Sequence, residues 1–183
     1  MRVLGISGSL RRDSYNSLLL RAAAELLPSG AELELYDGLK AIPPYDADDD
    51  VVPGPADVEA FRELVREVDA VFFATPEYNS SIPGQLKNAL DWGSRPLATN
   101  SFRNKPVAVI SSSAGAFGGV WAAAELRKVL GAMGARVTEA ELAVGHAAEK
   151  FDEHGRLADE DVRQGLREAL ATLVAEVPTA VAA

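Results

Sequence analysis

The sequence predicts one α/β domain built on a doubly wound, open parallel sheet with helices on both faces. Strand-like and helix-like hydrophobic patterns alternate along the chain, as expected for repeated strand–helix units. Residues 70–75 (AVFFAT) and 105–113 (KPVAVISSS) contain continuous apolar runs, which are typical of central parallel strands covered on both faces. A length of 183 residues is sufficient for one domain with a substantial core.

Two strand–helix pairs are predicted before the first central strand. Residues 3–6 form a short apolar strand, and the period-two alternation of residues 31–37 (AELELYD) predicts a more peripheral one. Between them, apolar side chains recur at the spacing of one helix face that ends near Pro28: Leu19, Ala22, Ala23 and Leu26. Residues 55–69 show the same helical spacing: Val58, Phe61, Leu64, Val65 and Val68.

The remaining elements follow the same alternation. A helix is predicted after Pro83 and Gly84 over the sequence QLKNALDWG, and another over residues 119–133. Residues 135–142 (ARVTEAEL) form a fifth strand, and residues 162–174 form a last helix. We expect one domain over residues 1–177 and a frayed tail over residues 178–183.

Residues 41–55 predict a surface loop because four prolines interrupt any regular element there. The loop carries a run of aspartates that lacks the glycine and the distal glutamate of a calcium-binding loop. We therefore expect these aspartates to be solvated, and we predict no metal site.

Composition restricts the partners of the protein. The formal net charge is −9 and the pI is about 4.7, so an acidic surface would repel nucleic acid and anionic membranes. The chain has no cysteine, which excludes disulfide, thiolate and zinc–thiolate chemistry. The N-terminus lacks the apolar segment of a signal peptide, and no apolar run is long enough to span a membrane. We expect a cytoplasmic protein that acts on small molecules.

Three loops leave the carboxyl ends of predicted strands, where open α/β sheets bind ligands: residues 7–16, 76–83 and 112–119. The first (SGSLRRDSYN) combines hydroxyl and amide donors with two arginines, just before a helix whose free amides and dipole favour anions. This composition favours a phosphate monoester, although a serine-rich helix cap with exposed arginines would have the same sequence. The loop contains neither GxxxxGK[ST] nor GxGxxG.

The second and third loops suit a planar ligand. In the second, Tyr78 offers a flat apolar face among polar neighbours, and two prolines stiffen the turn. In the third, Gly115, Gly118 and Gly119 permit a close approach of the backbone to a ligand, after a strand that ends in serines. Either loop alone could also be an ordinary capped turn.

The motifs GSLRRDSYNS, PEYNSSIPGQLKNALDW and SSSAGAFGG together resemble the three flavin loops of the NADPH-dependent FMN reductase family, which includes bacterial quinone and chromate reductases. IPPYDAD also resembles the loop after the second strand in that family. The resemblance covers roughly residues 2–135. It implies a flavodoxin-like fold with strand order 2-1-3-4-5 and noncovalent FMN, with NADPH or NADH as the reductant.

The resemblance also implies the residues that hold the cofactor. The FMN phosphate would lie against Ser9, Arg11, Ser14, Asn16 and Ser17; the isoalloxazine against Pro76, Glu77, Tyr78 and Asn79; and its other edge against Ser112 and Gly115. Because the flavin carries the chemistry, no catalytic triad or acid–base pair is required. The implied cycle is ping-pong: hydride passes to flavin N5 and then to a quinone, free flavin or a similar acceptor, with Tyr78 positioning the substrate.

Two other functions remain open at this stage. The protein could be a non-enzymatic electron carrier or redox sensor of the same fold, since strong acidity suits the docking of basic redox partners. It could instead be an NAD-binding Rossmann domain in which Asp37 binds the ribose, although the GxGxxG motif is missing.

The helix after Pro83 also predicts self-association. Leu86, Leu90 and Gly93 lie near one face and Trp92 lies beside it, which is more apolar surface than such a short helix needs against a sheet. The family resemblance implies at least a dimer. We therefore expect a homodimer or homotetramer with the flavin near the subunit boundary.

Overall fold

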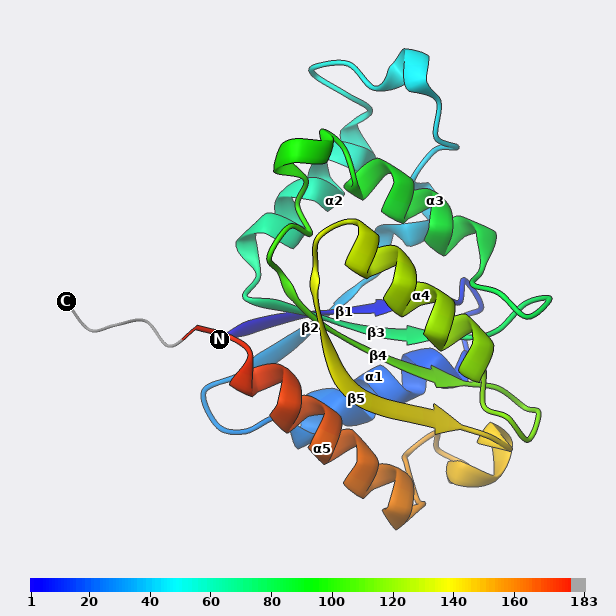
Figure 1. The fold of residues 1–183 in the computed structure, drawn as a ribbon. Helices are drawn as coiled ribbons and strands as arrows, with labels where there is room; N and C mark the ends of the chain where they lie inside the picture. Colours follow the sequence, from blue (N-terminus) through cyan, green and yellow to red (C-terminus); the bar gives the residue numbers. More distant parts are fainter. Residues whose placement is uncertain (179–183) are drawn as a thin grey trace.

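The computed structural model describes residues 1–178 and contains a five-stranded parallel sheet in the order β2-β1-β3-β4-β5 (Figure 1). The strands are β1 (Arg2–Ser7), β2 (Glu32–Tyr36), β3 (Ala70–Thr75), β4 (Pro106–Ser112) and β5 (Arg136–Val144). This is the order 2-1-3-4-5 predicted from the sequence. It differs from the order 3-2-1-4-5 of dinucleotide-binding Rossmann domains, which counts against that alternative.

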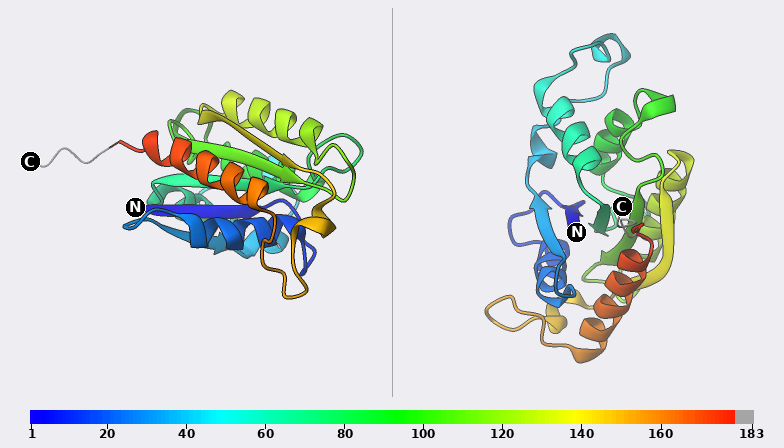
Figure 2. Two further views of the ribbon diagram at one scale, coloured as in Figure 1. Left: turned by 90° about the horizontal axis from the view of Figure 1, so that it is seen from below. Right: turned by 90° about the vertical axis from the view of Figure 1, so that its left-hand side faces the viewer.

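Helices cover both faces of the sheet, as Figure 2 shows. Helices α1 (Tyr15–Leu26) and α5 (Glu160–Ala175) pack on one face, and α2 (Ala56–Glu67), α3 (Gly84–Gly93) and α4 (Val120–Ala132) pack on the other. Short 3₁₀ turns lie at Gly38–Ala41, Ala47–Asp49, Leu97–Thr99 and Ala147–Lys150. None of the helices within residues 1–178 is long and apolar enough to cross a membrane. The predicted tail lies outside the described residues except for Pro178.

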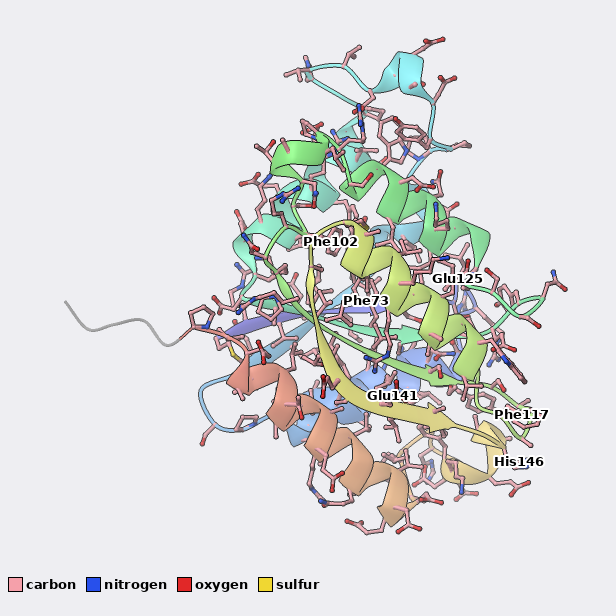
Figure 3. The ribbon with its side chains drawn as sticks, viewed as in Figure 1. Phe73, Phe102, Phe117, Glu125, Glu141 and His146 are labelled. Carbon is pink, nitrogen blue, oxygen red and sulfur yellow. The ribbon has the colours of Figure 1, made fainter. Side chains whose placement is uncertain are left out.

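The central strands are buried because both of their faces enter apolar cores. Along β3, Val71 and Phe73 face α2, α3 and α4, whereas Phe72 and Ala74 face α1 and α5. The rings of Phe73 and Phe102 lie 6.2 Å apart within the core between the sheet and helices α2, α3 and α4. Both residues are labelled in Figure 3. Every residue of β3 and β4 is buried, as the apolar runs predicted.

The aspartate-rich loop differs from the prediction at one position. Asp46, Asp48 and Asp49 are exposed, but Asp50 is largely buried and accepts hydrogen bonds from Arg62 (3.0 Å) and Arg95 (2.9 Å). The expectation that the whole cluster is solvated is therefore wrong for Asp50. These contacts anchor the loop to α2 and to the end of α3.

The predicted excess of apolar surface on α3 is also wrong. Leu86 and Leu90 are 1% exposed and Trp92 is fully buried, because α3 packs against both the sheet and the loop after β2. The indole N–H of Trp92 donates to the Pro43 carbonyl at 2.9 Å. These side chains are part of the subunit core and provide no surface for a partner.

Candidate functional site

The three predicted loops meet at the carboxyl ends of β1, β3 and β4, where they enclose a cavity of about 230 Å³. This is the point where the order of the strands reverses, because β1 is followed in sequence by the edge strand β2 but also pairs with β3. The cavity is lined by Ser9, Arg11, Ser14, Tyr15, Asn16, Pro76, Glu77, Tyr78, Ser112, Ser113 and Ala114.

The first loop is held in shape by its own hydroxyl groups. Ser14 caps α1, since its Oγ accepts from the Asn16 amide at 3.2 Å. The Ser17 hydroxyl lies 3.1 Å from that of Ser7, and the Ser7 Oγ accepts from the Ser9 amide at 3.3 Å. The N-terminus of α1 thus opens into the cavity beside serine hydroxyls, which favours a bound anion.

Asn16 joins the first loop to the end of β4. Its Nδ2 donates to the Ser112 carbonyl at 3.2 Å, and its Oδ1 accepts from the Ser112 amide at 3.1 Å. Asn16 is only 3% exposed. Its amide is therefore used to fix two walls of the cavity against each other, across 96 positions of sequence.

Arg11 is oriented by an aromatic stack that the sequence analysis did not find. The guanidinium carbon of Arg11 lies 5.5 Å from the centre of the Tyr15 ring. The Tyr15 ring in turn stacks on the ring of Phe151, with their centres 5.8 Å apart and their planes inclined by 19°. Tyr15 is the first residue of α1, and Phe151 follows the 3₁₀ turn after β5. Tyr15 belongs to the quoted motif, whereas no pattern near Phe151 indicates a role at the site.

The second loop forms a tight hairpin. The Tyr78 amide donates to the Ser81 carbonyl (3.0 Å), and the Ser81 amide donates to the Tyr78 carbonyl (3.1 Å). Asn79 and Ser80 between them have φ angles of 53° and 59°, the left-handed conformation of two-residue hairpin turns. Tyr78 is consequently held at the rim of the cavity with 52% of its surface exposed.

Two carboxylates tie this hairpin to α4. The Glu77 Oε2 accepts from the amides of Trp121 (3.1 Å) and Ala122 (3.2 Å), so it satisfies the free N–H groups of the first turn of α4. The Ser81 hydroxyl donates to Glu125 at 2.6 Å. These contacts fix the hairpin to the first two turns of α4.

The third loop presents a buried hydroxyl that lacks a partner. The Ser112 Oγ makes no hydrogen bond within residues 1–178, although Ser112 is 1% exposed and lines the cavity. The hydroxyls of Ser111 and Thr138 are buried without a partner in the same way, and neither residue lines the cavity, so this feature alone does not identify a ligand. The loop is supported by the chain after β5, because the His146 amide donates to Gly115 and the Ala147 amide donates to Ser113, both at 3.1 Å. Phe117 and His146 lie together at this edge in Figure 3.

The cavity contains eight of the eleven residues singled out from the sequence: Ser9, Arg11, Ser14, Asn16, Pro76, Glu77, Tyr78 and Ser112. Ser17, Asn79 and Gly115 do not line it; they lie in the hydroxyl network, at the hairpin tip and in the third loop, respectively. Tyr15 and Ala114 also line the cavity, but they were not predicted from the sequence.

This donor set fits FMN. Hydroxyls, a helix N-terminus and Arg11 suit the phosphate, while the aromatic ring of Tyr78 at the rim suits a planar ring. Glu77 is the acidic residue among those that line the cavity, and its carboxylate is held by the amides of α4.

Residues 1–149 match the family model described as NADPH-dependent FMN reductase. The chain belongs to this family. It is 44% identical over 174 residues to the NAD(P)H-dependent FMN reductase PA1204 of Pseudomonas aeruginosa, covering 94% of this chain and 93% of that protein. It is 41% identical over 155 residues to a quinone reductase of Pseudomonas putida, covering 84% and 83% of the two chains.

Among solved structures, the chain is similar to FerB, a flavoenzyme NAD(P)H:(acceptor) oxidoreductase from Paracoccus denitrificans. The two chains share a TM-score of 0.87 and 33% identity, and the match covers 96% of each. As a member of the NADPH-dependent FMN reductase family, the protein is an oxidoreductase that uses FMN and NAD(P)H. The flavodoxin-like fold expected from the motifs is confirmed.

Proposed function

We propose that this protein is a quinone reductase of the family, with FMN held noncovalently in the cavity at the carboxyl edge of the sheet. The observation that carries the proposal is the convergence of three loops on one cavity, lined by hydroxyl groups, the N-terminus of α1, Arg11 and Tyr78. The similarity to proteins named as quinone reductases supports a quinone as the acceptor. The proposal also includes free flavin and related molecules as alternative electron acceptors.

The first loop binds the phosphate of FMN in this proposal. The hydroxyls of Ser9 and Ser14, the free amides of α1 and the guanidinium of Arg11 are the direct donors. Asn16 and Ser17 act through the loop: Asn16 is bonded to the backbone of Ser112, and Ser17 to Ser7. The walls of the phosphate site are thus set before the ligand enters.

The hairpin and the third loop bind the isoalloxazine. Pro76, Glu77 and Ser112 line this part of the cavity, and Asn79 and Gly115 determine the shapes of the two loops. FMN bound there would supply hydride-transfer chemistry at its N5 atom between NAD(P)H and the acceptor, in a proposed ping-pong cycle. Tyr78 remains half exposed at the rim, where it guides the nicotinamide or the quinone. No acid–base residue is assigned.

The proposal is tested by steady-state oxidation of NADPH by the purified, FMN-loaded protein in the presence of a soluble quinone. We expect sustained turnover and parallel lines in double-reciprocal plots, because a ping-pong cycle releases the first product before the acceptor binds. A protein that binds FMN tightly but shows no sustained turnover would instead be an electron carrier or redox sensor, to which the net charge of −9 is also suited.

We also propose that the protein self-associates. The surface is not α3, as the sequence predicted, but an exposed apolar patch near the hairpin and the start of α4. Tyr78 on the hairpin, Phe117 on the third loop, and Val120 and Trp121 at the start of α4 are large apolar side chains with 40–66% of their surface exposed. The rings of Phe117 and Trp121 are in edge contact at 5.2 Å, and the amide of Trp121 is bonded to Glu77, next to Tyr78. Such a patch suits a second copy of the chain.

The oligomer is tested by light scattering at micromolar concentration. We expect a homodimer or homotetramer, and we expect Trp121→Ser to shift the population towards monomer. A wild-type monomer would contradict this part of the proposal without affecting the cofactor site. The cytoplasmic location remains a prediction from the sequence.

A further inference from the structure

A second pocket lies on the other side of the first loop. Its volume is about 290 Å³, and it is bounded by the ends of β1 and β2, the first loop, α1 and the 3₁₀ turn after β2. Ser9 and Arg11 line both this pocket and the FMN cavity, so the loop separates two adjacent hollows. The proposed function uses only one of them.

The second pocket is strongly cationic in an acidic protein. Arg11, Arg12, Arg21 and Lys40 line it against a single carboxylate, that of Asp37. Eleven of the 18 lysine and arginine side chains form ion pairs within residues 1–178, and four of the remaining seven are the cations of this pocket. This concentration of unpaired positive charge, in a chain with a net charge of −9, favours an anionic ligand.

The walls of the pocket add an apolar surface and an uncharged tyrosine. Leu10 and Leu35 also line the pocket and are 48% and 38% exposed. Burial, together with the carboxylates of Asp57 and Asp37, raises the pKa of Tyr36 to about 12. Tyr36 also lines the pocket and, like any tyrosine, is uncharged at neutral pH, so it adds no negative charge there.

We propose that this pocket is a binding site for a phosphorylated nucleoside. The phosphate lies among Arg12, Arg21 and Lys40, because a phosphate dianion is the ligand that several guanidinium and ammonium groups bind best. The base packs on Leu10 and Leu35, and Asp37 accepts a hydrogen bond from a ribose hydroxyl. Two kinds of ligand contain a phosphorylated nucleoside. One is NADPH, through its 2′-phosphoadenosine end, and its assignment rests on the proposed function; the other is a separate mononucleotide.

Binding is measured by calorimetric titration of the FMN-loaded protein with 2′,5′-ADP, 5′-AMP and inorganic phosphate at one low ionic strength. We expect saturable binding of 2′,5′-ADP or 5′-AMP that weakens at least about 10-fold in Arg21→Ala and in Lys40→Ala. Arg103→Ala is the matched control, because Arg103 is exposed and lies outside the pocket, near Gly134. It should leave the affinity unchanged, and FMN absorbance should be the same in all variants.

Kinetics separates the two sources. If NADPH is the ligand, Arg21→Ala raises the KM for NADPH about 10-fold while kcat and the KM for NADH stay constant. If a separate mononucleotide is the ligand, Arg21→Ala weakens the binding of 5′-AMP, and the KM values for NADPH and NADH both stay constant. Absence of nucleotide binding, or equal weakening in Arg103→Ala, overturns the proposal. The titration needs no turnover, so loss of quinone reduction with intact nucleotide binding contradicts only the proposed function.

Discussion

Replacing Asn16 with alanine tests whether the first loop and β4 form one prearranged site. The substitution removes two hydrogen bonds, of 3.2 and 3.1 Å, and leaves the amide and carbonyl of Ser112 without their partner. Each buried hydrogen bond contributes about 0.5–1.5 kcal/mol, and each orphaned buried group costs about 1–3 kcal/mol. Because two groups lose their partner, we expect the free energy of unfolding to fall by about 2–6 kcal/mol, which lowers the melting temperature by roughly 4–24 °C.

The assay is thermal unfolding of the apoprotein, monitored by circular dichroism, followed by FMN titration of the folded variant. FMN affinity should fall as well, since Ser112 lines the cavity. Ser17→Ala is the control, because it removes only the contact with the Ser7 hydroxyl at a partly exposed position. Asn16→Asp should not restore stability, because a carboxylate cannot donate to the Ser112 carbonyl. A melting temperature and FMN affinity equal to those of the wild type would refute the reasoning.

Two further predictions concern the loop after β2 and the rim of the cavity. Hydrogen bonds from Arg95 and Arg62 hold the pKa of Asp50 below its usual value, so its stabilising contribution is complete above about pH 4 and is lost as the pH falls further. Asp50→Asn should therefore lower the melting temperature at pH 7, and the difference from wild type should shrink below about pH 4; a constant difference would exclude this linkage. Tyr78→Ala should alter steady-state kinetics while leaving the melting temperature nearly unchanged, because the side chain is half exposed; equal turnover with every acceptor would reduce Tyr78 to a turn residue.

The fold was predictable because the spacing of apolar residues along the chain matches the pattern of burial in each helix and strand. The apolar runs became the buried strands β3 and β4, and the alternating residues 31–37 became the edge strand β2. The site followed from the same reasoning, since loops that leave the carboxyl ends of parallel strands must meet. Eight of the candidate residues consequently line one cavity.

Contacts between distant segments were not predictable from a local pattern. The amide of Asn16 looked like a phosphate donor, but it is bonded to a backbone 96 positions away. Phe151 supports Tyr15 from a segment without any motif. Trp92 and its neighbours on α3 seemed too apolar for a short helix, because the sequence did not show that the loop after β2 covers them. That loop, which contacts Trp92 through the Pro43 carbonyl, has no hydrophobic periodicity that would predict its position.

The central claim is that the first loop binds the FMN phosphate through Arg11, and it is tested most directly by paired titrations of the apoprotein with FMN and riboflavin. Riboflavin has the same ring system without the phosphate, so wild-type protein should bind it more weakly. At one fixed ionic strength, Arg11→Ala should weaken FMN binding by about 10- to 150-fold and leave riboflavin binding nearly unchanged. Equal losses for both ligands, or no loss for either, would contradict the assignment of this loop as the phosphate site.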